Sequence, residues 1–276
     1  MKYEILHRTR YAYDTPMRDS FNDVRLEPLS TIEQTVESFS LRVLPGVPVN
    51  RYTDFYGNWI HHFEIPDNHT YLLIESRARV KTHPIVPPAA EARPCPLREI
   101  SRQPEMELYR EFLQGSRYVE IEVEPWQLAL DATVGQTDAW QAALAIMDFV
   151  HGFLNYEPGT TRVQNHVRDV MKERRGVRQD YAHLMICLCR SLKIPARFVS
   201  GYLATETADA THAWVEVFIP RYGWLALDPV YNCQPEGTYV KIGHGRDYAD
   251  VPPVTAGYHG GIRRTMEEEI TIRPAE

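Results

Sequence analysis

The sequence has few of the features that mark disulfide-rich or zinc-binding proteins. It holds four cysteines among 276 residues, with no CxxC pair and no regular spacing. These are Cys95, Cys187, Cys189 and Cys233. A disulfide framework or a zinc site needs closely organised ligands, so we expect reduced thiols, no metal and no other cofactor.

Long apolar runs and an excess of positive charge are also missing. No run approaches the roughly 20 apolar residues of a membrane-spanning helix, and the N-terminal stretch MKYEILHRTRYAY carries charges where a signal peptide is apolar. Thirty basic against thirty-seven acidic residues give a net charge of −7, which argues against non-specific nucleic-acid binding. We therefore expect a cytoplasmic protein with neither a membrane nor a nucleic acid as partner, and assign no oligomeric state.

The chain changes character once, near residues 84–98. Before it, strand-like runs with alternating apolar residues are separated by turn signals such as Asp14-Thr15-Pro16, which predicts a small β-sandwich over residues 1–85. The proline-rich stretch 86–98 favours neither a helix nor a central strand and is predicted to be a linker. After it the apolar period lengthens, for example over 137–153. We expect an α+β core domain over residues 99–276.

The best-defined helix lies over residues 179–193. Its apolar stripe has helical spacing and Pro195 follows its end; the stripe is Tyr181, Leu184, Met185, Leu188 and Leu192. A turn at Gly176 places position 178 at the helix N-terminus, where unpaired N–H groups favour negative charge and would lower the pKa of a cysteine. The residue there is Arg178, whose charge costs about 0.3–1 kcal/mol in that position. Such a conflict is typical of a functional site or a former one.

Two strand-like segments follow, at 211–219 and 224–228. A loop of about five residues would pair Phe218 with Trp224 and hence Trp214 with Asp228. In that register Asp228 is the diagonal neighbour of His212 on the same face, within side-chain reach. The carboxylate could then hold one imidazole nitrogen while the other faces the helix terminus. A loop one residue shorter would put the two side chains on opposite faces.

Three segments in this order resemble the core of the transglutaminase-like superfamily, which is related to papain: GVRQDYAHLMICLCRSLKIPARFVSGY, THAWVEVFIPRYGWLALDP and GRDYADVPP. The first 85 residues, with HRTRYAY and DFYGNWIHHFEI, resemble the β-rich N-terminal region of bacterial members, including cysteine proteases. The resemblance implies a papain-like core, in which the helix that carries the nucleophile packs on an antiparallel sheet. It covers most of the chain.

The resemblance also implies site residues. His212 matches the family's base, Asp228 its orienting carboxylate, and Arg178 occupies the position of its nucleophilic cysteine. The implied ancestral chemistry is cysteine-dependent acyl transfer or amide hydrolysis on a peptide or protein with glutamine or amide side chains. Further candidate binding residues are Gln179, Tyr156, Trp214, Arg246, Asp247 and Tyr248, of which the last three rest on resemblance alone. For Tyr156 and Trp214 a place in the core is the alternative, and Val230-Tyr231 after Asp228-Pro229 departs from the family's Asp-Pro-Thr-Asn.

Three functions remain open at this stage. In the first, the protein is a pseudoenzyme that binds a peptide, a protein or a carboxylate ligand; an Arg178–Asp228 ion pair would instead close the pocket and make the role structural. In the second, it is an active enzyme in which Cys233 or a metal-bound water attacks. In the third, the native gene encodes cysteine at 178, because cysteine and arginine codons can differ by one base.

Overall fold

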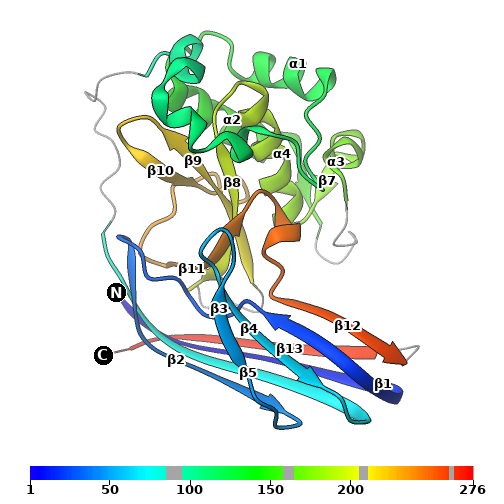
Figure 1. Ribbon diagram of the computed structural model, residues 1–276. Coiled ribbons are helices and arrows are strands. Elements are labelled where there is room, and N and C mark those ends of the chain that lie inside the picture. The colour runs from blue at the N-terminus through cyan, green and yellow to red at the C-terminus, as the bar shows by residue number, and fades with distance from the viewer. Residues whose placement is uncertain (85–94, 158–164, 205–210, 261–263, 276) are drawn as a thin grey trace.

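The computed structural model describes residues 1–84, 95–157, 165–204, 211–260 and 264–275, and it places a large sheet beneath an α+β core (Figure 1). The large sheet has seven strands in the order β2-β5-β1-β4-β3, with β12 and β13 also paired to β1. These strands are β1 Lys2–Val24, β2 Gln34–Leu44, β3 Asn50–Thr53, β4 Trp59–Ile65, β5 His69–Thr82, β12 Val254–Gly260 and β13 Arg264–Pro274. Most of the predicted linker, residues 86–94, lies outside the described residues.

The large sheet folds over along β1. The first half of β1 pairs with β5 and β13, and its second half pairs with β4 and β12. Figure 1 shows β1 reversing direction between these halves, where the sequence has Asp14-Thr15-Pro16. Tyr11 and Leu72 from one half share a buried cluster with Phe63 and Ile65 from the other. One continuous sheet therefore supplies both layers of the β-sandwich.

The end of the chain belongs to this sheet. β13 runs antiparallel to the first half of β1, from Tyr3 opposite Pro274 to Tyr13 opposite Arg264. The range 99–276 that the sequence suggested for the core therefore contains two strands of the N-terminal sheet. Alternating apolar residues predict a strand but do not name its partner, so the pattern could not reveal this pairing.

The core is an antiparallel sheet of four strands in the order β10-β9-β8-β11, with helices on one side (Figure 1). The strands are β8 Ala196–Leu203, β9 His212–Ile219, β10 Gly223–Leu227 and β11 Tyr239–Gly245; a separate two-stranded ladder joins β6 Asn155–Tyr156 to β7 Arg175–Gly176. The helices are α1 Val123–Ala132, α2 Ala139–Phe153, α3 Val167–Glu173 and α4 Arg178–Ser191. Short 3₁₀ helices are η1 Leu97–Arg102, η2 Pro104–Glu107, η3 Arg110–Leu113 and η4 Tyr248–Asp250. The predicted α+β core, with a helix packed on an antiparallel sheet, is confirmed.

Helix α4 is the centre of the core. Every residue from Asp180 to Ser191 is buried, because strands β8 and β9 contact the helix on one side and α1, α2 and α3 contact it on others. The predicted stripe is therefore only part of the buried surface. Among the described residues, no helix is both apolar and long enough to cross a bilayer.

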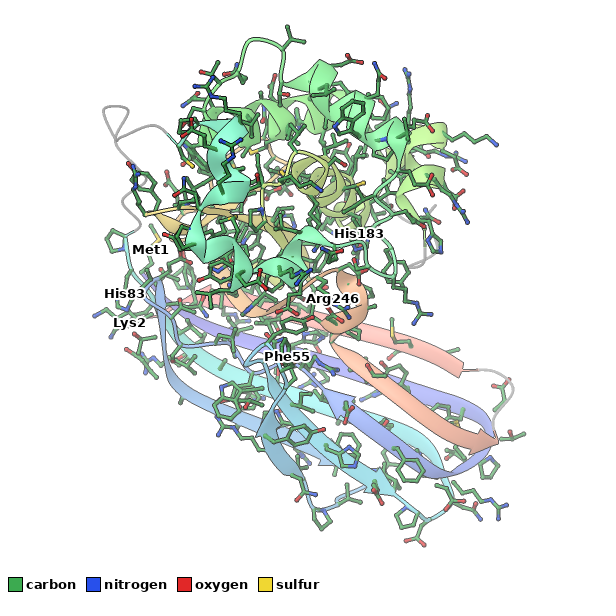
Figure 2. All side chains as sticks on the ribbon, turned by 45° about the horizontal axis from the view of Figure 1, so that its top comes forward. Met1, Lys2, Phe55, His83, His183 and Arg246 are labelled. Carbon is green, nitrogen blue, oxygen red and sulfur yellow. The ribbon has the colours of Figure 1, made fainter. Side chains whose placement is uncertain are left out.

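The large sheet and the core are joined by apolar and polar contacts. Tyr3, Ile5 and Val80 of the large sheet pack against Tyr202 and Val240 of the core. At the other end, the turn before β4 reaches the core through an amide side chain: Nδ2 of Asn58 donates to the carbonyl of His244, and the His244 N–H donates back to Oδ1 of Asn58, both at 2.8 Å. Phe55 in this turn and Arg246 lie at the junction in Figure 2. The two parts are thus fixed at both ends.

A buried ion cluster lies on the core sheet. The carboxylate of Glu216 accepts from Nζ of Lys241 at 2.7 and 2.8 Å and from Arg197 at 2.6 Å. Burial alone would raise the pKa of Glu216, but attraction to Arg197 and Lys241 outweighs it and lowers the pKa to about 2. Burial lowers the pKa of Lys241 to about 8, against the attraction of Glu216.

We expect Glu216→Gln to destabilise the protein by roughly 3–5 kcal/mol near neutral pH, because two cations would lose their buried partner. A carboxyl whose folded pKa is lowered stabilises the fold above its unfolded pKa, and this contribution is lost as pH falls from 4.5 through about 2. The difference in unfolding free energy between the two proteins should therefore shrink in that window. Urea denaturation from pH 6 downward measures it, and two parallel stability curves would contradict the expectation.

Candidate active site

His212 and Asp228 meet as the predicted register requires. Trp224 pairs with Phe218 and Leu227 with Val215, so Asp228 follows at the end of β10 beside the start of β9. Nε2 of His212 donates to Oδ2 of Asp228 at 2.6 Å, and both residues are buried. The hairpin loop therefore has the length that puts the two side chains on one face.

The carboxylate of Asp228 is held by four donors. Oδ1 accepts from the backbone N–H groups of Val230 and Tyr231 at 2.8 and 3.2 Å. Oδ2 accepts from the Tyr239 hydroxyl at 2.8 Å in addition to His212. Sequence reasoning missed Tyr239, because it reaches the site through the pairing of β11 with β8, which no local spacing encodes. The four donors fix the carboxylate, which in turn orients the imidazole.

The second imidazole nitrogen of His212 is left to accept a proton. Because Nε2 donates to Asp228, Nδ1 is the unprotonated nitrogen of the neutral ring, and within the described ranges no residue hydrogen-bonds to it. The ring packs against Trp214, Tyr231 and Tyr239, with centroids 5.5–6.3 Å apart. Trp214 is buried and so forms a wall of the histidine site, which matches the predicted alternative of a core position. The pair has the arrangement of a general base with its orienting acid.

Arg178 is the first residue of α4, as the sequence predicted. The carboxylate of Asp180 accepts the Val177 N–H at 2.8 Å, and the N–H groups of Asp180 and Tyr181 both donate to the Val177 carbonyl. Gly176 permits this close turn, because a Cβ there would lie 2.6 Å from the Cβ of Asp180. The N–H groups of Arg178 and Gln179 have no acceptor in the described part of the chain, as expected at a helix start.

The side chain of Arg178 lies near Tyr156. The β6–β7 ladder pairs Tyr156 with Gly176, and the guanidinium carbon of Arg178 lies 5.8 Å from the Tyr156 ring centroid, within cation–π range. Arg178 and Gln179 are both half-buried. Among the described residues Arg178 forms no ion pair, and the oxygens of Asp228 are bonded elsewhere. The closed Arg178–Asp228 pair considered from the sequence is therefore not formed.

Cys233 lies beside Asp228, the carboxylate partner of His212. Its backbone forms two hydrogen bonds with that of Asp228, and its Sγ lies 3.5 Å from the Tyr239 hydroxyl oxygen. Burial raises the pKa of the Cys233 thiol, which opposes formation of a thiolate. Cys187 lies inside α4, and burial raises its pKa to about 12. No hydrogen bond joins any of these thiols to His212 within the described ranges.

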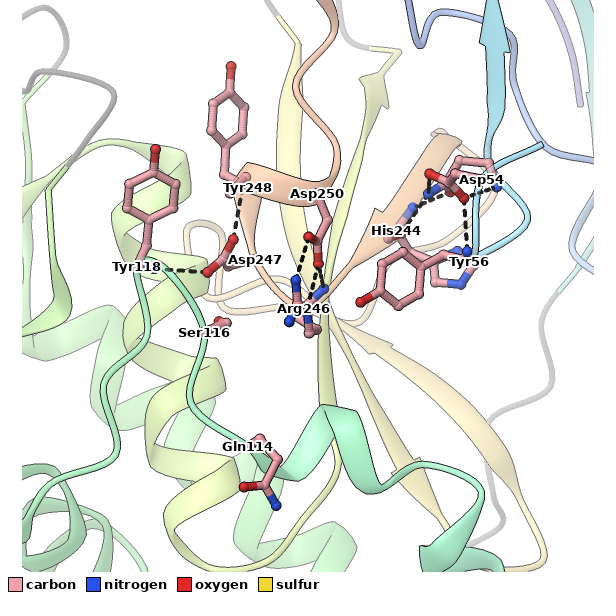
Figure 3. A network of polar contacts seen from close by, with 12 residues as sticks. Asp54, Tyr56, Gln114, Ser116, Tyr118, His244, Arg246, Asp247, Tyr248 and Asp250 are labelled. Atoms are coloured by element: carbon pink, nitrogen blue, oxygen red, sulfur yellow. Dashed lines mark hydrogen bonds and ion pairs between the residues drawn. The ribbon is translucent and has the colours of Figure 1, made fainter. Parts of the chain in front are cut away.

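The candidate binding residues Arg246, Asp247 and Tyr248 form a corner after β11 (Figure 3). Asp247 is buried and accepts the N–H groups of Tyr118 and Ala249. The Arg246 guanidinium donates to the Asp250 carboxylate at 3.0 Å. The backbone N–H of Tyr248 donates to Nε2 of His183. The contacts of these three residues are partly within the corner and partly with Tyr118 and His183, and their role in binding stays a prediction. Within the described ranges, no group of three or more potential ligands could hold a metal ion.

Two family models match the chain, one after the other. The bacterial transglutaminase-like N-terminal region matches residues 3–81, and the transglutaminase-like superfamily core matches residues 127–229. The first range contains β2 to β4 and all but one residue each of β1 and β5. The second runs from within α1 to one residue beyond Asp228, and so it includes Arg178, His212 and Asp228.

Individual proteins extend the similarity. An uncharacterised protein of Mycobacterium leprae is 31% identical over 272 residues, which cover 94% of each chain. A crystal structure of a candidate cysteine protease from Cytophaga hutchinsonii covers 100% of this chain and 92% of its own, with 26% identity and a TM-score of 0.79. A protein-glutamine gamma-glutamyltransferase of Pseudomonas aeruginosa is 35% identical over 102 residues, which cover 32% of this chain and 15% of that enzyme.

Proposed function

The chain belongs to the transglutaminase-like superfamily, and on this premise we propose that it is a pseudoenzyme that binds a peptide or protein without turning it over. The proposal rests on a site that has the histidine base and its carboxylate partner but lacks a nucleophile. The bond between His212 and Asp228, 2.6 Å long, is what a cysteine acyl-transfer site needs. Arg178 is the first residue of α4, in the position that the sequence resemblance assigns to the family's cysteine.

The step that this site cannot perform is the first step of acyl transfer, the attack of a nucleophile on the amide. In an intact site a thiolate attacks the carbonyl of an amide, the histidine protonates the departing amine, and N–H groups at the helix start stabilise the oxyanion. A guanidinium stays protonated in proteins and has no lone pair to offer, so Arg178 cannot attack. Cys233 is a poor substitute, because its thiol adjoins Tyr239 and its pKa is raised, whereas a nucleophile must lie within hydrogen-bond reach of its base.

The same residues suit a carboxylate ligand. A guanidinium can bind a carboxylate through two parallel hydrogen bonds, and the N–H groups of Arg178 and Gln179 add donors and a positive helix end. A glutamate side chain or a C-terminal carboxylate of a peptide should therefore bind better than a neutral glutamine amide. The pseudoenzyme would then bind a carboxylate such as that of glutamate, whereas its active relatives act on the glutamine amide. A cytoplasmic location belongs to this proposal and is supported by four free cysteines.

The proposal is tested on the unmodified chain with paired peptides that differ only in one glutamine or glutamate. We expect no ammonia release from the glutamine peptide, even with an added amine, and tighter binding of the glutamate peptide. Arg178→Gln should weaken glutamate binding about tenfold or more, since a hydrogen bond to a charged group is lost, and should spare the glutamine peptide. Ammonia release that disappears in His212→Ala would refute the pseudoenzyme. The native-gene alternative is settled by sequencing, where we expect an arginine codon.

A further inference from the structure

Helix α1 carries large apolar side chains on its solvent face. Val123, Trp126, Leu130 and the following Val134 are 77%, 45%, 40% and 79% exposed. The spacing of three and four residues puts Val123, Trp126 and Leu130 on one face of the helix, and Val134 lies in the turn that follows the helix. We refer to these four residues as the α1 stripe. The opposite face of the helix is buried through Pro125 and Ala129, so the helix is already anchored without the stripe.

The α1 stripe has no cover within the described part of the chain. Figure 1 shows α1 on the outer side of the core, at the end away from the large sheet. Single exposed apolar residues are ordinary, but a contiguous row of them marks an interaction surface. An amphipathic helix that lies along such a row is a recurring mode of recognition.

Acidic residues border the α1 stripe. Glu122, Glu124 and Asp131 are exposed on or next to the same helix. From Val119 to Glu157 the chain has seven acidic residues and no lysine or arginine, while the other 30 acidic residues are matched by 30 basic ones. The net charge of −7 thus comes from the segment that carries the stripe.

We infer that the α1 stripe docks a helical segment of a partner protein whose apolar face is bordered by lysine and arginine. Charge selects this occupant. A second copy would bring acidic borders against each other, and an anionic lipid surface would repel them. A basic helix gains both apolar burial and attraction to Glu122, Glu124 and Asp131. The inference uses no residue of the candidate active site and goes beyond the proposed function.

The test uses a labelled synthetic helical peptide of about 18 residues, with leucines on one face and lysines beside them. Its counterpart has the same leucines and glutamates in place of the lysines. We expect the full chain to bind the basic peptide in a fluorescence anisotropy titration and to ignore the acidic one. The double variant Trp126→Ser, Leu130→Ser should weaken binding at least about tenfold, as should the triple variant Glu122→Gln, Glu124→Gln, Asp131→Gln.

Matched controls lie on the large sheet and at its junction with the core. Phe55→Ser removes an aromatic residue that is 83% exposed, and Glu267→Gln neutralises an exposed acid on β13; neither should change binding. Equal binding by the Trp126→Ser, Leu130→Ser protein would overturn the inference, as would failure of the unmodified chain to bind. The inference would also be overturned if sedimentation showed that the unmodified chain self-associates and that the double variant does not.

Discussion

Arg178→Cys is expected to convert this chain into an enzyme that releases ammonia from glutamine peptides, with a gain on the order of 10⁶-fold over the unmodified chain. That factor is the loss seen when the analogous triad of a serine protease loses its nucleophile. The new thiol would stand at the first position of α4, where the helix dipole and nearby N–H groups lower the pKa of a cysteine. The histidine and its carboxylate are already hydrogen-bonded at 2.6 Å.

Two further substitutions in the Arg178→Cys protein separate chemistry from folding. His212→Ala should abolish the gain, because no base would remain to take the proton. Tyr239→Phe removes one donor from the four that hold Asp228, and should reduce kcat by a smaller factor while leaving the thermal unfolding temperature nearly unchanged. An Arg178→Cys protein that stays inactive while its thiol reacts rapidly with iodoacetamide would show that the base is misplaced.

The second large effect concerns Arg190, which is fully buried. Its guanidinium donates to the carbonyl oxygens of Ala196, Gln114 and Arg246 at 2.6–3.1 Å and lies 3.3 Å from the hydroxyl of Ser116. Figure 3 shows Gln114 and Ser116 on one segment of the chain and Arg246 on another, at the end of β11. Burial lowers the pKa of Arg190 to about 10, so it stays charged at neutral pH. One side chain thus holds three separate segments to α4.

Arg190→Met should lower the free energy of unfolding by roughly 3–5 kcal/mol, because buried carbonyl groups would be left without donors. Arg190→Lys keeps the charge but has a single nitrogen for acceptors spread over several segments, so an intermediate loss is expected. Arg168→Met on the exposed face of α3 is the matched control and should change stability by no more than about 0.5 kcal/mol. Urea denaturation measures all three, and a loss below about 1 kcal/mol for Arg190→Met would contradict this account.

The sequence predicted those parts of the site that depend on local geometry. Helix period and the turn at Gly176 placed Arg178 at the start of α4, and hairpin length placed His212 beside Asp228. Tyr239 and Arg190 were not predicted, because their partners are brought together by the packing of distant segments. Arg190 lies off the predicted apolar stripe of its helix, and it is buried because the segment 114–118 and the end of β11 pack over it.

The pairing of β1 with β13 has a consequence for how the protein is made. Tyr3 leaves the ribosome long before its partner Pro274. One edge of β1 therefore stays unpaired while the whole core is synthesised. Pairings of such wide sequence separation form slowly, and a strand edge that stays open invites aggregation. The core, whose strands and helices follow one another closely along the chain, can assemble during that interval. We therefore expect closure of the sheet to follow assembly of the core, and nascent chains to depend most on chaperones before that closure.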